Sequence, residues 1–336
     1  MVEKITNIKI NDLAKKIVQE IIINKNLYRA TVHSLDNGAT VIDMKMATWE
    51  GGRLVAEICM GGLGTVNFSN YLIDNHFLPL VNVYTSYPII SCIASQLAGW
   101  SVKLKKEIEV DGIVKKNLFF DSLGSGPARV KSKVEQKLFE EIKYNDDSDC
   151  AIIVFETSKS PNEEVMQIIA DKCKVDINNT YAIYAPTACL TGSIQVAARI
   201  VETGIHKLHQ IGFPIEIIQD GFGTTTLAPI AKNDIEAMGR TNDSIIAGGM
   251  TYYTINIDKE KEEEIFKLVR KAPAKCSSNY GKPFLELFKE VDYDFYKIDP
   301  GLFAPAIYSI TNIKTGKTIS SGLNNLDLLK KSYGLN

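Results

Sequence analysis

Three groups of residues have types and spacings that could do chemistry. Arg199 and Glu202 stand three positions apart in a segment with helical periodicity, where their side chains are neighbours and can form an ion pair. Spacing alone favours a solvated surface pair that contributes a few tenths of a kcal/mol. His206 and His209 follow on the same segment and could share a metal ion, but a histidine pair alone gives weak support for a metal site.

The third group is the turn LGSGPAR at 123–129. Backbone N–H groups at the start of a following helix, together with Arg129, could hold a phosphate or a carboxylate. A glycine turn with a capping serine fits the same residues equally well. A second glycine-rich turn at 61–64 lacks the lysine and hydroxyl pair of a nucleotide-binding loop, so it indicates close backbone packing or a ligand-lining loop.

The elements around these groups alternate between strands and helices. YAIYA at 181–185 predicts a strand, and an amphipathic helix follows it with Ile194, Val201 and Ile205 on the apolar side. Thr187, Thr191 or Ser193 is expected to cap that helix. Strands are also predicted at 54–60, 78–88, 151–158, 215–219 and 250–257, and helices at 11–28, 89–100, 130–143 and 163–173. This alternation is typical of an α/β fold.

Four short polar segments are expected to form turns. Asp36-Asn37-Gly38, Asp111-Gly112 and Thr315-Gly316 carry hairpin signals, and Asp220-Gly221-Phe222-Gly223 is expected to end the strand before it. No internal repeat or low-complexity linker separates parts of the chain. Residues 1–90 with 285–336 are therefore assigned to a first lobe and 91–284 to a second, with the two lobes interwoven.

The composition excludes several classes of protein. The chain has 336 residues, a formal net charge of −2 and 45% hydrophobic residues, so it lacks the positive charge that would hold nucleic acid or an anionic membrane. No apolar run is long enough to span a bilayer, and we expect a cytoplasmic protein. The six cysteines show no CxxC and no short Cys/His spacing, so neither a zinc site nor a disulfide framework is predicted.

Several stretches together resemble the methenyltetrahydromethanopterin cyclohydrolase family of archaeal and methylotrophic one-carbon metabolism. They lie in matching order along nearly the whole chain, and DYDFYKID is the most unusual of them. The matching stretches are DNGATVID at 36–43, AEICMGGLGTV at 56–66, ASQLAGW at 94–100, LGSGPAR at 123–129, YAPTACLTGSIQVAARIVETGIHK at 184–207, AMGRTNDSIIAGG at 237–249, YGKPF at 280–284 and DYDFYKIDPGLFAPA at 292–306.

The resemblance implies an enzyme that reversibly hydrolyses the N5,N10-methenyl bridge of a tetrahydromethanopterin-type carrier to the N5-formyl form, with no metal and no redox cofactor. It also implies a mixed-sheet α/β (α+β) protein of two lobes with the active-site cleft between them, assembled as a homotrimer. The family's catalytic R-x-x-E pattern falls on Arg199 and Glu202. Glu202 is then the general base and acid toward water, and Arg199 orients it.

The same resemblance suggests residues that contact the pterin. Ser125, Gly126 and Thr187 are expected to line the cleft, and His206 either reaches the water or faces solvent. Leu97 stands where methanogen members carry a lysine that methylotroph members also lack, so it points to that branch or to a changed substrate tail. Two alternatives stay open: a cyclohydrolase for another carrier such as methenyltetrahydrofolate, and a non-catalytic pterin-binding homologue.

Overall fold

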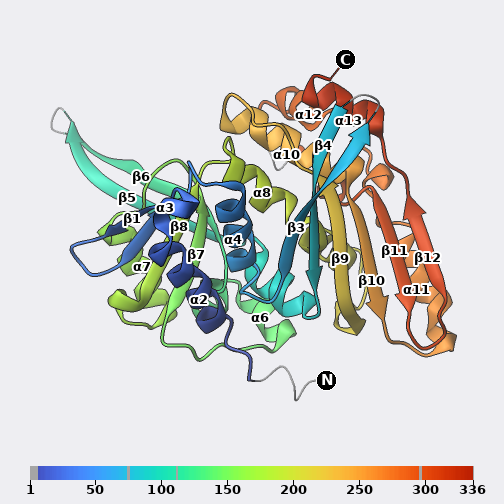
Figure 1. Cartoon of the computed structure of the whole chain (residues 1–336), viewed down its shortest axis with the longest axis horizontal. Coiled ribbons are helices and arrows are strands. Elements are labelled where there is room, and N and C mark those ends of the chain that lie inside the picture. The colour runs from blue at the N-terminus through green and yellow to red at the C-terminus, as the bar shows by residue number, and fades with distance from the viewer. Residues whose placement is uncertain (1–6, 74–75, 111–112, 295–296, 336) are drawn as a thin grey trace. The chain divides into compact units, whose positions relative to one another are not determined.

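The chain forms two compact units, each built from helices and a six-stranded mixed sheet (Figure 1). The computed structural model describes residues 7–73, 76–110, 113–294 and 297–335. The first unit is Met1–Gly62 with Ala94–Pro186, and the second is Leu63–Ile93 with Thr187–Asn336. The mixed sheets confirm the predicted α/β (α+β) class.

This division differs from the predicted lobes of 1–90 with 285–336 and of 91–284. The reason is strand pairing, because β2 (Thr40–Asp43) pairs in parallel with β8 (Thr180–Ala185). That pairing joins the N-terminal segment to the middle of the chain. The C-terminal strand β11 (Ile307–Asn312) pairs instead with β10 (Met250–Ile255).

The sheet of the first unit has the order β1-β2-β8-β7-β6-β5. Its central pairs β2–β8 and β7–β8 are parallel, and the outer pairs are antiparallel. Its further strands are β1 (Thr31–Ser34), β5 (Trp100–Val110), β6 (Ile113–Ser125) and β7 (Ala151–Glu156). Its helices are α2 (Ile10–Ile23), α3 (Lys25–Tyr28), α4 (Trp49–Cys59), α5 (Ala128–Ser132), α6 (Gln136–Ile142), α7 (Glu163–Cys173) and the short 3-10 turn η2 (Ile177–Asn179).

The core of this unit forms where α7 packs on the sheet. Val165, Met166 and Ile169 of α7 lie against Ile153 and Phe155 of β7, and all five are buried. Period-two alternation in β7 and helical spacing in α7 bring these apolar side chains to facing surfaces. The strand and the helix predicted at 151–158 and 163–173 are therefore confirmed.

Two of three local predictions in the first unit can be compared with the structure. The Asp36-Asn37-Gly38 turn joins β1 to β2 as expected, and Gly38 has the positive φ of 96° that this turn requires. The Asp111-Gly112 turn lies outside the described residues. The strand predicted at 54–60 is wrong, because these residues belong to helix α4, whose N-cap Thr48 accepts a hydrogen bond from the Gly51 amide.

The sheet of the second unit has the order β12-β11-β10-β9-β4-β3, and β10–β11 is its one parallel pair. Its further strands are β3 (Thr65–Ile73), β4 (His76–Thr85), β9 (Ile218–Thr226) and β12 (Thr318–Gly322). Its α-helices are α8 (Leu190–Ala197), α9 (Ile200–Gln210), α10 (Asp234–Gly248), α11 (Glu262–Val269), α12 (Phe284–Glu290) and α13 (Leu326–Tyr333). Its 3-10 turns are η3 (Ile215–Ile217), η4 (Lys259–Lys261), η5 (Ala274–Cys276) and η7 (Pro300–Leu302).

Two further segments differ from their predictions, one in the second unit and one at the boundary of the two units. Residues 220–223, expected to form a turn, run through the middle of β9, where Gly221 and Gly223 leave room for helix α9. The helix predicted at 89–100 is shorter and wider, and forms a π-helix η1 over Ile89–Gln96. The hairpin predicted at Thr315-Gly316 is confirmed between β11 and β12.

Candidate active site

The helix expected after β8 is broken at Ala198 and Arg199, which separate α8 from α9. Arg199 becomes the N-cap position of α9, with φ −78° and ψ 4°, and Glu202 is the third helical residue. Cys189 caps α8 through its sulfur, which accepts the Gly192 amide at 3.3 Å, so the predicted hydroxyl caps are wrong. The break places both charged residues at the start of a new helix.

The Arg199 guanidinium and the Glu202 carboxylate form a close, largely buried ion pair. The Nε and one terminal nitrogen of Arg199 lie 2.9 and 2.8 Å from the same oxygen, Oε2 of Glu202. The Glu202 side chain is 2% exposed and that of Arg199 is 20% exposed. The solvated surface pair that spacing alone favours is therefore wrong, and the buried carboxylate has two positive neighbours, the guanidinium and the N-terminal end of α9.

Beyond Arg199, the charge of Glu202 acts on two buried titratable side chains, Cys92 of the π-helix η1 and Tyr253 of β10. Burial and the charge of Glu202 raise the pKa of the Cys92 thiol, so Cys92 is uncharged at neutral pH. Burial also raises the pKa of Tyr253 well above its ordinary value, and Glu202 adds to that effect. Neither residue was among the residues predicted for the site, although the alternation of MTYYTI places Tyr253 on the buried side of β10.

The other residues expected to contact substrate divide between the two units. Thr187 and His206 belong to the second unit with Arg199 and Glu202. Thr187 is buried, and His206 is half-buried one helical turn beyond Glu202 on α9. Leu97, Ser125 and Gly126 belong to the first unit, and their surroundings are described separately below.

In the first unit, Ser125 and Gly126 form a tight turn at the end of β6. Ser125 is buried, and its hydroxyl donates to the sulfur of Cys59 at 3.4 Å. Gly126 has φ 97°, and its amide donates to the carbonyl of Ser95 at 2.8 Å. Leu97, just after the π-helix, is half-buried.

The buried guanidinium of Arg129 pairs with backbone carbonyls and a carboxylate beside this turn. Its side chain is fully buried and donates to the carbonyls of Ala94 at 3.0 Å and Ser95 at 3.2 Å. Its Nε also donates to Glu135 at 2.8 Å. Because the guanidinium is committed to these partners, the glycine-turn interpretation of LGSGPAR is supported over an anion site at Arg129.

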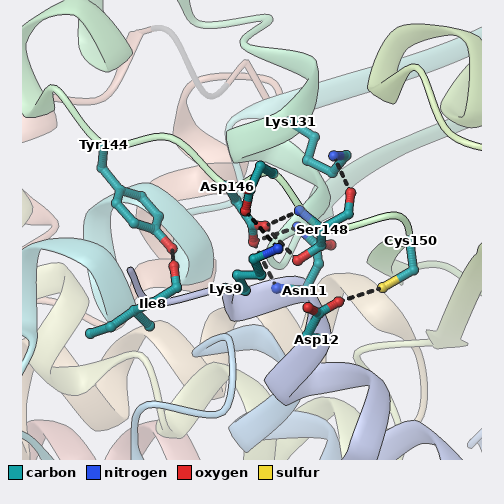
Figure 2. A network of polar contacts seen from close by, with 10 residues as sticks. Ile8, Lys9, Asn11, Asp12, Lys131, Tyr144, Asp146, Ser148 and Cys150 are labelled. Carbon is teal, nitrogen blue, oxygen red and sulfur yellow. Dashed lines mark hydrogen bonds and ion pairs between the residues drawn. The ribbon is translucent and has the colours of Figure 1, made fainter. Parts of the chain in front are cut away.

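A buried polar network around Asn11 anchors the same turn to the first helix. The side-chain amide of Asn11 donates to Oδ2 of Asp146 at 3.0 Å (Figure 2). The same amide donates to the carbonyl of Pro127, also at 3.0 Å. The backbone amide of Asn11 donates to the same Asp146 oxygen at 2.8 Å, and its side-chain carbonyl accepts the Ile152 amide at 3.0 Å. Asn11 is fully buried, so each of its polar atoms depends on these partners.

Replacement of Asn11 with Ala is expected to lower the free energy of unfolding by about 3 kcal/mol, since it leaves buried partners without hydrogen bonds. Urea denaturation followed by circular dichroism measures the change. The exposed Asn26 on α3 provides the control, because Asn26→Ala removes no buried contact and should leave stability unchanged. Equal stability of the two variants would contradict the anchoring role of Asn11.

Two general features of the described residues bear on the kind of site. Their His, Cys, Asp and Glu side chains form no group of three or more that could hold a metal ion. None of the helices in this part of the chain is both long enough and apolar enough to cross a membrane.

Comparison with known proteins shows similarity along almost the full length. Residues 9–333 match the family described as Cyclohydrolase (MCH). The chain is 41% identical over 333 residues to methenyltetrahydromethanopterin cyclohydrolase of Methanocaldococcus jannaschii, which covers 97% of this chain and 98% of that protein. It is 38% identical over 331 residues to the protein of the same name from Methanosarcina barkeri, with 98% and 99% covered. The matched region contains every residue of the candidate site.

Proposed function

Since the chain belongs to the methenyltetrahydromethanopterin cyclohydrolase family, we propose that this cyclohydrolase opens the N5,N10-methenyl bridge of a tetrahydromethanopterin-type carrier to give the N5-formyl form, reversibly. The observation that carries the proposed mechanism is the buried carboxylate of Glu202, fixed through Oε2 by Arg199. A carboxylate held by one oxygen keeps the other, Oε1, in a defined direction where it can accept a proton from water.

The chemistry of the bridge explains why such a carboxylate suffices. The methenyl carbon lies between two nitrogens in an amidinium cation, so it is already electrophilic. Water adds to this carbon as Glu202 removes one of its protons, which gives a neutral carbinol. Glu202 then returns the proton to N10 as the carbon–N10 bond breaks, and the carbinol loses its O–H proton as the formyl group forms. One proton is released overall, and the oxidation state of the carbon is unchanged.

Arg199 has an orienting role in this proposal. Its two nitrogens on one carboxylate oxygen restrict the rotamer of Glu202, and restriction of a catalytic group lowers the entropic part of the barrier. The guanidinium also offsets negative charge that develops on the attacking oxygen. We propose Thr187, His206, Ser125, Gly126 and Leu97 as contacts of the pterin or its tail.

Three further properties stay predictions that follow from the family resemblance. Hydrolysis transfers no electrons, so we propose that the enzyme needs no redox cofactor, and the cationic substrate supplies the electrophile without a metal. Turnover should therefore be unchanged after incubation with EDTA and gel filtration. The homotrimer is checked by light scattering coupled to size-exclusion chromatography.

The substrate is tested by parallel assays with methenyl-tetrahydromethanopterin and methenyl-tetrahydrofolate, followed by loss of near-UV absorbance. We expect hydrolysis of the methanopterin compound at a kcat/KM at least about tenfold higher, because one set of lost tail contacts costs about 1.4 kcal/mol or more. Turnover of the folate compound alone would show that the carrier is wrong. No turnover of either would support a non-catalytic pterin-binding protein.

A further inference from the structure

The N-terminal part of α9, which carries Glu202, packs directly against the backbone of two glycines in strand β9. A Cβ atom at Gly221 would lie 2.7 Å from Val201, and one at Gly223 would lie 2.9 Å from Ile200. A Cβ atom at Gly204, on the helix itself, would lie 2.0 Å from the hydroxyl oxygen of Tyr253. Contacts this short leave no space for a side chain, so this part of α9 can approach the sheet only because these three positions are glycine.

Two buried tyrosines of the sheet bind the backbone of this part of α9. The Tyr253 hydroxyl donates to the carbonyl of Val201 at 2.8 Å, and the Tyr308 hydroxyl donates to the carbonyl of Gly204 at 3.3 Å. Both side chains are at most 1% exposed. Burial raises the pKa of each phenol well above its ordinary value, so both remain donors across the working pH range.

The two bonds differ in their relation to Glu202. Val201 directly precedes Glu202, so the carbonyl that Tyr253 binds belongs to the peptide unit that ends at the Glu202 amide. Gly204 follows Glu202 by two residues, and its bond to Tyr308 is 0.5 Å longer than the bond between Tyr253 and Val201. The Tyr253 hydroxyl therefore has the more direct control over the position of the Glu202 backbone.

We propose that Tyr253 is a positioning residue for the hydrolysis, because its hydroxyl fixes the peptide that presents Glu202 to Arg199 and to the reacting water. The inference rests on the proposed role of Glu202. A catalytic carboxylate loses efficiency when it shifts by a fraction of an ångström, and a helix turn that is bound at its carbonyl is held against such a shift. Tyr253 itself contacts neither Arg199 nor the substrate in this proposal.

Tyr253→Phe removes the hydroxyl and keeps the ring, so the packing beneath α9 is largely preserved. We expect kcat to fall about tenfold with KM within about twofold of wild type, since the loss falls on the orientation of Glu202 and not on substrate binding. Tyr308→Phe is the matched control, because it removes an equally buried hydroxyl that donates to a carbonyl of the same helix. Its kcat should fall less than about threefold, while the thermal midpoints of the two variants should be similar.

A double-mutant cycle separates positioning from general stability. In the Glu202→Gln background, Tyr253→Phe should cause no further loss of kcat, because no catalytic carboxylate remains to be positioned. Multiplicative losses in the cycle, or equal losses of kcat in the two tyrosine variants, would show a merely structural role. The thermal midpoint of each variant confirms that the measured protein is folded.

The outcomes also distinguish this inference from the proposed function. Wild-type kcat in Tyr253→Phe, beside an inactive Glu202→Gln, overturns only the positioning role. Wild-type kcat in Glu202→Gln overturns the catalytic role of the carboxylate and, with it, the role of Tyr253. A selective fall of kcat in Tyr253→Phe that disappears in the Glu202→Gln background supports both.

Discussion

Glu202→Gln is expected to lower kcat about a thousandfold and to leave KM within a few-fold of wild type. Glutamine has almost the same shape and can still accept a hydrogen bond from Arg199, but it cannot take a proton from water or return one to N10. General acid–base groups typically contribute a factor of about 10² to 10⁴, and here one carboxylate serves both steps. Loss of near-UV absorbance of the methenyl substrate measures the rate.

The control for this change is Glu262→Gln in the same unit. Glu262 is also buried, and it accepts hydrogen bonds from Asn312 and Thr315, so its replacement removes a similar buried charge away from α9. Turnover of Glu262→Gln should stay close to wild type once folded protein is selected by size-exclusion chromatography. Near wild-type turnover of Glu202→Gln would refute the mechanism and would leave the membership of the family untouched.

The charged pair could be located from the sequence, but its burial could not. The R-x-x-E spacing places Arg199 and Glu202 as neighbours on any helix, which the structure confirms. The helical period continues through residues 194–208, so it gives no sign of the break at Ala198 and Arg199. Burial of Glu202 depends on what packs around α9, and such tertiary neighbours are invisible to periodicity.

Two of the wrong local predictions concern segments whose composition fits more than one kind of structure. Residues 54–60 resemble a buried strand by composition, but they belong to helix α4, which begins after its N-cap Thr48. Residues 220–223 have the composition of a turn, but in β9 the two glycines accommodate Val201 and Ile200. A glycine in a strand often marks a site where another part of the protein packs closely against the backbone. The sequence alone does not identify that part, which here is helix α9.

The turn at 123–129 shows the same limit for a candidate site residue. Its glycines and its place between a strand and a helix could be predicted, and Gly126 does adopt a positive φ. Arg129 could equally have faced a ligand or the interior, because a guanidinium pairs with carbonyls as well as with anions. Only the positions of Ala94, Ser95 and Glu135 decide between these possibilities.

A buried carboxylate on α10 is expected to make the stability of the protein fall as the pH rises. Asp243 is 1% exposed, and its two oxygens accept the Phe284 amide at 3.0 and 3.1 Å. One of them also accepts the Ser332 hydroxyl at 2.6 Å. Burial raises the pKa of Asp243 from 3.8 to about 7, and the charge of Glu286 adds to this, while the two donors oppose it.

The sign of the pH effect follows from this raised pKa. Between pH 3.8 and about 7 the folded protein holds a proton on Asp243 that the unfolded chain has released. The stabilisation linked to that proton is fully present below pH 3.8 and is lost as the pH rises through about 7. The difference between the ordinary pKa of 3.8 and the raised pKa of about 7 corresponds to about 4 kcal/mol in the free energy of unfolding.

Asp243→Asn tests this linkage because asparagine keeps the shape, can accept the Phe284 amide and never ionises. Urea denaturation at pH 5 and pH 8 should show a smaller loss of stability on raising the pH in the variant than in wild type, by about 3 kcal/mol, because only the two pH units between 5 and about 7 contribute. The exposed Asp258, which pairs with Lys314 and has a lowered pKa, gives the control. Asp258→Asn should change the pH dependence only slightly, and in the opposite direction. Parallel curves for wild type and Asp243→Asn would show that Asp243 is ionised in the folded protein at both pH values, which the depth of its burial argues against.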